Sequence, residues 1–316
     1  MYSMRIKPII VLLTGFIFVS YPIAQDKQFM DMKGPYLGQP PPGLTPEIFA
    51  PGIVSTEKRE LNSVFTPDGK EFYFSIQTPG EGYAVWFMRK EEDGWTTRRK
   101  APFNSEYSDV DMCVSCDGKH MFFGSTRPLT TGGPPPGDFQ IWVVQRMGDG
   151  WDEPKNLGAP VNAGKRSLYP TITREGTLYF QGIFPESFGG RDIYRSRLVN
   201  GVYTEPENLG SAINSQYNEG DVLIAPDESF IIVSTGGRPD GYGGGDLYIS
   251  FRKDDGSWTK VMNMGSRINS SATEYCPMLS PDGKYFFFTS KKTGNGDIYW
   301  VSARIIDELR KSSNNR

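Results

Sequence analysis

The sequence predicts an all-β fold, a five-bladed β-propeller of four-stranded antiparallel blades, closed by an N-terminal strand that completes the last blade. Three observations predict it. Strand-like segments of three kinds recur about every 50 residues. The 316 residues include 36 glycines, 24 prolines and 13% aromatic residues, which is typical of short strands joined by tight turns. The segment TPEIFAPGIVS, residues 45–55, resembles the end of a repeat although it precedes the first one.

The first recurring element is a hairpin whose turn contains an acidic residue, followed in four of the five cases by glycine. The turn acids are spaced 49, 58, 52 and 55 residues apart: Asp68, Asp117, Glu175, Asp227 and Asp282. Proline before Asp-Gly presets a tight turn, and glycine adopts the backbone angle that other residues avoid. The runs after the turns, such as YFFF (285–288) and FIIV (230–233), are apolar without alternation, which indicates strands packed on both faces.

Two further strands complete each repeat. The third strands are expected at residues 84–90, 140–146, 192–198, 246–252 and 297–303. The closing strands are expected within residues 94–105, 150–163, 201–215 and 257–270. The fifth repeat has no closing strand of its own, so we expect residues 45–55 to supply it and to pair Ile48 with the strand that contains Ile298 and Tyr299. A closed ring has no free edge strand available for aggregation.

The two ends of the chain lie outside the repeats. A signal peptide is predicted over residues 1–24 from the basic residues Arg5 and Lys7, the apolar run 9–20 and the small residue Ala24. Pro22 is atypical three positions before the expected cleavage site, so an uncleaved membrane anchor is the alternative. We expect an N-terminal extension at 25–44, the propeller at 45–303 and a polar, loose C-terminal tail at 304–316. The mature chain is expected to be periplasmic or secreted, monomeric and without a membrane span.

The Pro-Asp-Gly hairpin followed by Gly-x-Asp-Ile-Tyr resembles the WD40-like β-propeller repeats of the PD type over residues 45–303. Such repeats form the propeller of TolB-like periplasmic proteins and occur in many bacterial envelope proteins. The resemblance implies the fold and an envelope location, but propellers host unrelated activities and the function must be argued from a site. The extra domains of TolB-like proteins and of the peptidase relatives are not apparent in this sequence.

Charge and residue usage exclude several function classes. The formal net charge is −3 and there is no Lys/Arg run of the kind that a nucleic-acid-binding face requires, so no nucleic-acid partner is expected. His120 is the single histidine, which excludes a metal held by several histidines and argues against Ser-His-Asp or Cys-His catalysis. Cys113 and Cys116 have redox spacing but run from a strand into a turn, so we expect buried thiols or a local disulfide.

The first group of candidate binding residues lies at one mouth of the central channel, where the innermost strands begin. An almost acidic column precedes each turn by seven residues, and a second polar column follows it two residues later. The predicted residues are Glu60, Asn62, Asp109, Asp111, Tyr169, Glu219, Asp221 and Glu274. Their oxygens can bind a polar ligand or Ca²⁺, the one cofactor considered. The alternative is that they hydrogen-bond the backbone of the neighbouring blade.

The second group lies on the long loops 125–139, 184–191 and 236–245, which break the symmetry of the repeats. These loops are expected to form a rim of arginine and aromatic side chains for a sugar, a peptide or a partner protein. The rim residues are Arg127, Phe188, Arg191, Arg238 and Tyr242. The alternative is that the loops are long surface segments without a ligand.

Two functions follow from these candidates. The first is a non-catalytic exported propeller that binds a protein or a glycan of the cell envelope. The second is a glycoside hydrolase or lyase that uses carboxylates at the channel mouth, with two acids about 5 to 10 Å apart. Nothing in the sequence singles out such a pair. A calcium-stabilised structural module is a third hypothesis.

Overall fold

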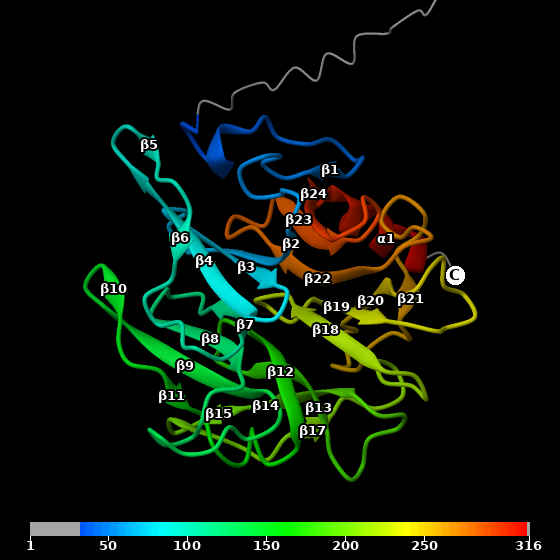
Figure 1. The fold of residues 1–316 in the computed structure, drawn as a ribbon. Helices are drawn as coiled ribbons and strands as arrows, with labels where there is room; N and C mark the ends of the chain where they lie inside the picture. Colours follow the sequence, from blue (N-terminus) through cyan, green and yellow to red (C-terminus); the bar gives the residue numbers. More distant parts are fainter. Residues whose placement is uncertain (1–31, 315–316) are drawn as a thin grey trace, which may run out of the picture.

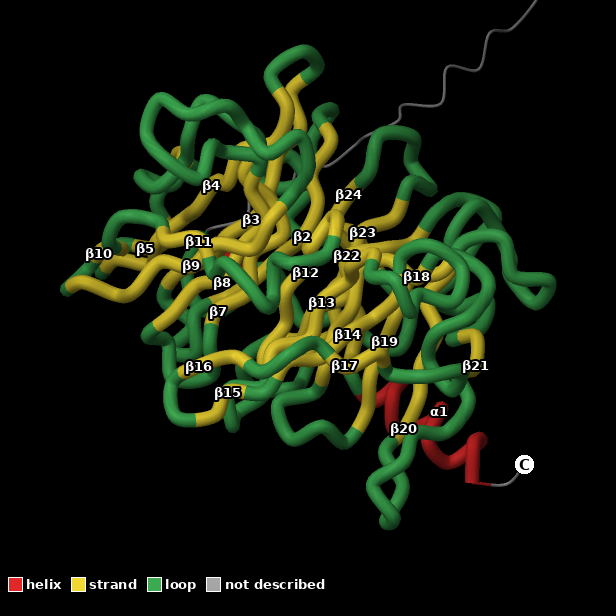
Figure 2. The backbone as a smooth tube through the Cα atoms, turned by 90° about the horizontal axis from the view of Figure 1, so that it is seen from below, coloured by secondary structure: helices red, strands yellow, loops and turns green. Residues whose placement is uncertain are grey.

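The computed structural model describes residues 32–314, and within that range five small antiparallel sheets stand around a common axis (Figure 1). Seen along the perpendicular direction, the strands converge toward the middle and the loops lie outside (Figure 2). The five-bladed propeller predicted from the repeats is therefore confirmed. The predicted signal peptide, 1–24, and the first part of the extension lie outside the described residues.

The first two blades follow one another directly along the chain. From the axis outward, blade 1 consists of β2 (Arg59–Phe65), β3 (Glu71–Thr78), β4 (Gly82–Glu91) and β6 (Arg99–Lys100), with β5 (Gly94–Trp95) on the end of β4. Blade 2 consists of β7 (Asp109–Val114), β8 (His120–Ser125), β9 (Gln140–Met147) and β11 (Lys155–Asn156), with β10 (Gly150–Trp151) on β9.

Cys113 is buried, Cys116 is exposed and both thiols are free, so the two do not form a disulfide and only Cys113 matches the expected buried thiol.

The remaining blades repeat this order. Blade 3 consists of β12 (Lys165–Ile172), β13 (Leu178–Ile183), β14 (Asp192–Ser196) and β17 (Glu207–Asn208), beside a small hairpin of β15 (Leu198–Val199) and β16 (Val202–Tyr203). Blade 4 consists of β18 (Glu219–Ile224), β19 (Phe230–Thr235), β20 (Asp246–Phe251) and β21 (Met262–Asn263). Blade 5 consists of β22 (Glu274–Leu279), β23 (Tyr285–Ser290), β24 (Asp297–Ser302) and β1 (Glu47–Ile48).

The ring closes where the chain begins, as predicted. β1 pairs antiparallel with β24, and Ile48 is opposite Tyr299. The amide of Phe49 continues the pairing by donating to the carbonyl of Ile298 at 2.8 Å. The Phe49 ring is fully buried, with ring centres 5.2 Å from those of Phe287 and Trp300. Burying a side chain of this size contributes roughly 1.5–3 kcal/mol, so the closing strand is held by packing as well as by backbone hydrogen bonds.

Part of the N-terminal extension also packs against this seam. It contains one turn of 3-10 helix, η1 (Tyr36–Gly38), in which Leu37 is buried. The ring of Tyr36 lies 4.9 Å from Tyr285, and its hydroxyl donates to Asp282 Oδ1 at 2.9 Å. The extension therefore contacts the turn side of blade 5, at the channel end opposite the predicted binding mouth.

Each innermost strand contains a register shift near its beginning. The shifts lie between Leu61 and Ser63, Val110 and Cys113, Leu168 and Thr171, Glu219 and Val222, and Tyr275 and Met278. Four residues at these bulges have φ between 51° and 57°, which is uncommon outside glycine: Asn62, Asp111, Tyr169 and Cys276. A bulge bends its strand and redirects a side chain. One residue of each blade is thereby available to the other blades at the axis.

The C-terminal segment corrects an expectation. Residues 304–314, expected to be loose, form helix α1 (Arg304–Asn314). Ile305 and Ile306 are buried against blades 4 and 5, and Arg310 lies 4.6 Å from the ring centre of Phe251. The polar composition of the tail predicted a loose segment, but its first residues include a short apolar stripe. This stripe packs the helix against the blades. Of the helices within residues 32–314, none has both the length and the apolar character that a membrane crossing requires.

Candidate functional site

The first predicted column is built into the turns that enter the blades. We call Glu60, Asp109, Glu219 and Glu274 the capping carboxylates, because each is buried and accepts hydrogen bonds from the residue four positions earlier. Glu274, for example, accepts from the Ser270 amide at 2.9 Å and from the Ser270 hydroxyl at 2.7 Å. In blade 3 the position is Ser167, whose hydroxyl donates to the Val161 carbonyl at 3.0 Å. The column therefore has structural contacts, but they are made to the turn that enters each blade and not, as the structural alternative expected, to the backbone of the neighbouring blade.

Neighbouring groups engage the capping carboxylates further. Asp109 forms a 2.6 Å ion pair with Arg127, and Glu274 accepts from the Ser290 hydroxyl at 2.6 Å. Burial raises the pKa of Glu219 to about 7, although hydrogen bonds from Ser215 act in the opposite direction. The capping carboxylates therefore stabilise the loop between blades, and only Glu274 also lines the pocket described below.

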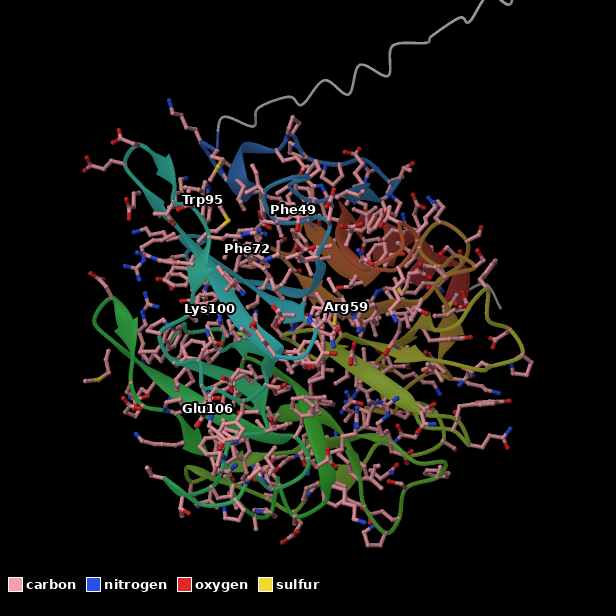
Figure 3. The ribbon with its side chains drawn as sticks, viewed as in Figure 1. Phe49, Arg59, Phe72, Trp95, Lys100 and Glu106 are labelled. Carbon is pink, nitrogen blue, oxygen red and sulfur yellow. The ribbon has the colours of Figure 1, made fainter. Side chains whose placement is uncertain are left out.

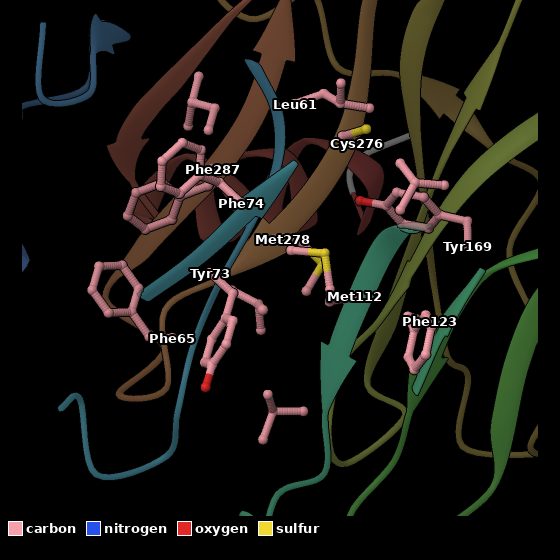
Figure 4. Packing of buried hydrophobic residues seen from close by; sticks show 14 of the residues in the cluster. Leu61, Phe65, Tyr73, Phe74, Met112, Phe123, Tyr169, Cys276, Met278 and Phe287 are labelled. Atoms are coloured by element: carbon pink, nitrogen blue, oxygen red, sulfur yellow. The ribbon is translucent and has the colours of Figure 1, made fainter. Parts of the chain in front are cut away.

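The second predicted column meets at the axis. We call it the axial ring, and it consists of Asn62, Asp111, Tyr169, Asp221 and Cys276, one residue per blade. The Tyr169 hydroxyl points toward the strand that carries Cys276 and Met278 (Figure 4), and it donates to the carbonyl of Pro277 at 3.1 Å. Below this level Met112 and Met278 lie side by side in the apolar core (Figure 4). The axis is therefore packed here, and it forms a floor beneath the channel mouth.

Hydrogen bonds within the axial ring join different blades. Asn62 Oδ1 of blade 1 accepts from the amide of Met112 in blade 2 at 3.2 Å. Asp221 Oδ2 of blade 4 accepts from the amide of Cys276 in blade 5 at 3.0 Å and from its thiol at 3.3 Å. The structure thus brings all five axial residues together, including Cys276, which was not among the predicted site residues.

Asp111 differs from the other members of the ring because its Oδ1 atom is buried and has no hydrogen-bond partner among residues 32–314. Burial, followed by the nearby charge of Asp221, raises the pKa of Asp111 well above its usual range. Burial also raises the pKa of Asp221. The two carboxyl groups therefore retain protons at higher pH than free aspartates do. Because one of its oxygens makes no hydrogen bond among residues 32–314, Asp111 contributes least of the axial ring to the contacts between blades.

A pocket of about 440 Å³ opens at this mouth of the channel. It is lined by residues from blades 1, 3, 4 and 5 and the turns between them: Arg59, Arg191, Asn218, Gly220, Asp221, Ser234, Thr235, Gly236, Gly244, Gly245, Thr273, Glu274, Tyr275 and Lys291. Its glycines allow close backbone approach; a Cβ on Gly236 would lie 2.9 Å from the Gly244 carbonyl oxygen. Arg59 lies where the ribbons of blades 1, 4 and 5 approach one another (Figure 3).

One wall of the pocket combines an aromatic ring with two cations. The guanidinium of Arg59 lies 5.9 Å from the ring centre of Tyr275 and donates to its hydroxyl at 3.4 Å. The ammonium of Lys291 lies 5.9 Å from the same ring centre. Such cation–π contacts place positive charge beside the ring. Arg191 lines the pocket from blade 3, and its side chain makes no ion pair among the described residues.

The predicted rim residues do not form one surface. Arg127 is bound to Asp109 and lies 5.2 Å from the ring centre of Phe123, and Arg238 lies 4.7 Å from that of Tyr248. Phe188 and Tyr242 are 55% and 51% exposed on separate loops. Of the predicted rim, only Arg191 lines the pocket.

Sequence reasoning missed three residues that line the pocket, Arg59, Tyr275 and Lys291. Arg59 and Tyr275 are direct neighbours of predicted positions, Glu60 and Glu274, and Lys291 follows the second strand of blade 5. Tyr275 and Lys291 have no counterpart in the other repeats, and Arg59 has one only in Arg166 of blade 3, so a search for repeated positions passes over them. A comparison of each repeat for unmatched cations near the strand ends could have found them.

The described residues show no group of three or more His, Cys, Asp or Glu side chains placed to hold a metal ion. The hydrogen bonds of the capping carboxylates explain this in part, because their oxygens are occupied by amides and hydroxyls. Calcium binding stays a prediction that no cluster of carboxylates in residues 32–314 supports.

Comparisons with known proteins show the fold. No family model and no curated protein sequence matches the chain. TolB from Acinetobacter baumannii is similar in structure, with a TM-score of 0.50, 16% identity and coverage of 79% of this chain and 59% of that one. This chain thus spans less than two thirds of that TolB. An endo-arabinase from Bacteroides thetaiotaomicron VPI-5482 gives a TM-score of 0.52 at 12% identity, covering 83% and 97%.

A glycoside hydrolase is also similar, with a TM-score of 0.55, 10% identity and coverage of 83% of this chain and 91% of that one. At such identities the likeness shows the fold alone. The similar structures include both TolB and glycan-acting enzymes, so the fold does not choose between a binding and a catalytic function. The TolB-like propeller is supported, whereas the PD-type repeat family stays a prediction.

Proposed function

We propose that this protein is an exported, periplasmic or secreted propeller that binds a glycan of the cell envelope in the pocket at the channel mouth, without catalysis. The observation that carries the proposal is the composition of the pocket. It has a closed floor, polar side chains from four blades and one aromatic ring, that of Tyr275. Its volume falls within the range of small-molecule sites.

A glycan suits this pocket better than a protein partner does. A stable protein interface buries roughly 800 Å² on each side and has an apolar centre. The pocket instead offers hydroxyl, amide and backbone groups, such as Ser234, Thr235 and Asn218. These groups match the hydroxyls of a sugar, and the ring of Tyr275 offers an apolar surface to the sugar's carbon–hydrogen face.

Binding without catalysis follows from the state of the carboxylates that line the pocket. Glu274 accepts three hydrogen bonds from Ser270 and Ser290. Asp221 accepts from Cys276 on one oxygen and from Gln181 on the other, at 3.3 Å. A general acid or base must exchange a proton with the reacting group, and both acids are instead engaged by the protein.

A second candidate function is glycoside cleavage through Asp111 and Asp221. The observation in its favour is that Asp111 has an unpartnered oxygen and a raised pKa beside a second carboxylate. A raised pKa is what a general acid requires. Asp111 is buried in the floor and does not line the pocket, so we rank this candidate second.

The test is a thermal-shift screen of the purified protein against envelope and plant-wall oligosaccharides, with product analysis by mass spectrometry. A ligand at one hundred times its Kd stabilises the folded state by about 2.7 kcal/mol, which raises Tm measurably. We expect a Tm increase without product. Product formation that stops in Asp111→Asn would support the hydrolase instead.

Two tyrosine variants locate the site. Tyr275→Ala should abolish the ligand-induced Tm increase, because Tyr275 lines the pocket. Tyr242→Ala is the matched control, since this ring is exposed on the predicted rim and does not line the pocket. Loss of the shift in Tyr242→Ala alone would move the site to the rim, and no shift with any glycan would reject the proposal.

A further inference from the structure

We propose that the glycan bound at the channel mouth is acidic, and that a single sugar carboxylate, as in a uronic acid, is held between Arg59, Arg191 and Lys291. This inference rests on the proposed function and specifies its ligand class. Among the pocket-lining residues these three cations face two carboxylates, Asp221 and Glu274. The lining therefore has one positive charge in excess.

The second step is that these cations are unpaired. Several other half-buried arginines in residues 32–314 have carboxylate partners, such as Arg127 with Asp109 and Arg146 with Glu71 at 2.7 Å. Within this described range Arg59 donates only to neutral groups, the Tyr275 hydroxyl and Gln77 Oε1. The side chains of Arg191 and Lys291 make no hydrogen bond or ion pair among the described residues. Their donors are thus free for a ligand.

The third step is that each unpaired cation has a like charge beside it. Burial, and then the positive charge of Arg166, lowers the pKa of Arg191. Burial, and then the charge of Arg59, lowers the pKa of Lys291. Arg166 also has a buried Nε atom that finds no hydrogen-bond acceptor in the described part of the chain. Partly dehydrated like charges repel one another, and an anion between them would relieve both the repulsion and the lost hydration.

The fourth step concerns the kind of anion. A guanidinium presents a planar pair of donors that matches the two oxygens of a carboxylate. Asp221 and Glu274 stand in the same wall, and a phosphate dianion would be repelled by them about twice as strongly as a carboxylate monoanion. The excess of one positive charge therefore suits a carboxylate. The sugar hydroxyls would then face Asn218, Ser234 and Thr235.

Calorimetric titration of the purified protein tests the inference with three trisaccharides, of galacturonate, mannuronate and glucuronate. Each is paired with its methyl ester, which keeps the sugar skeleton and removes the charge. Inorganic phosphate and triglutamate are the other two probes. We expect at least one trisaccharide to bind at least tenfold more tightly than its ester, and to weaken as salt is raised.

Three variants identify the cations. Arg191→Gln and Lys291→Gln should each weaken binding of that trisaccharide about tenfold, with Tm of the free protein unchanged because neither side chain makes a hydrogen bond or an ion pair within residues 32–314. Lys292→Gln is the matched control, since it is the exposed neighbour of Lys291 and should bind as the parent does. Equal loss in Lys292→Gln and Lys291→Gln would overturn the assignment.

The outcomes separate this inference from the proposed function. If the methyl esters or neutral glycans bind as tightly as the acids, the carboxylate inference is wrong and the glycan-binding proposal stands. If triglutamate or phosphate binds while every glycan, charged or neutral, stays silent at millimolar concentration, both are wrong.

Discussion

The capping carboxylates and the axial ring lie only two residues apart on the same innermost strands, yet they differ in almost every respect. The capping position is acidic in four of the five blades, and each acid bonds to its own entering turn. The axial position carries asparagine, aspartate, tyrosine, aspartate and cysteine in turn, and its contacts reach other blades. The capping position, which repeats, makes contacts within its own blade and entering turn. The axial position, which varies, makes contacts between blades.

The physical reason is the environment of each ring. The four capping carboxylates each accept from the residue four positions earlier, so the same chemistry satisfies them in blades 1, 2, 4 and 5. The axial residues share one small space, where five carboxylates would repel and five tyrosines would not fit. Variation at the axis is therefore required by packing, and it creates a mouth whose charges are unequal from side to side. The pocket lies on the side of Arg59, Arg191 and Lys291.

The largest expected effect distinguishes the two rings within one strand. Asp109→Asn should lower the free energy of unfolding by about 3 kcal/mol, because it removes the buried partner of Arg127. The same substitution two residues later, Asp111→Asn, is the matched control. Urea denaturation measures both, and a cost below about 1 kcal/mol for Asp109→Asn would contradict a structural role for the capping carboxylates.

The second effect is a pH dependence from the capping carboxylates. Because the folded-state pKa of Glu219 is raised from 4.5 to about 7, the folded protein binds more protons than the unfolded chain in that window. Its contribution to stability is therefore fully present below pH 4.5 and is lost as pH rises to 7 and beyond, by roughly 1–3 kcal/mol. Glu219→Gln should lack this slope. Denaturation at pH 5, 6, 7 and 8 tests it, and parallel curves for the two proteins would count against it.

A smaller effect measures how much the axial ring stabilises the blades. Tyr169→Phe removes the hydroxyl that donates to the Pro277 carbonyl and leaves that carbonyl without this donor. The expected loss is about 1 kcal/mol in the free energy of unfolding. Tm of the variant measures it, and a change within error would mean that this cross-axis bond contributes nothing.

The smallest effect has the opposite sign. Asp111→Asn should leave stability at pH 7 unchanged or raise it by up to about 1 kcal/mol, since the carboxylate is buried beside Asp221 with one oxygen unpartnered. The gain should disappear at low pH, where the parent carboxyl is protonated. A loss above 1 kcal/mol would show that Asp111 is as structural as Asp109.

Much of the fold and part of the site could be predicted from the sequence. The Asp-Gly turns and the apolar strands predicted the number of blades. The segment 45–55, which resembles the closing strand of a repeat, predicted the pairing of Ile48 with Tyr299. The polar columns were found, but their roles depended on contacts that spacing does not reveal. Arg127 is predicted to lie on the rim because it is an arginine in a long loop, whereas in the structure its guanidinium forms an ion pair with Asp109. Helix α1 was missed because Ile305, Ile306 and Leu309 are few among polar neighbours.

The sequence by itself determined the repeats, their number and the strand that closes the ring, because turns and strands are set by residues close together in the chain. Only the tertiary structure decided which charges remain unpaired at the channel mouth, because Arg59, Arg191 and Lys291 come from three blades. Their pairing depends on distances across the axis, and no local pattern encodes those distances.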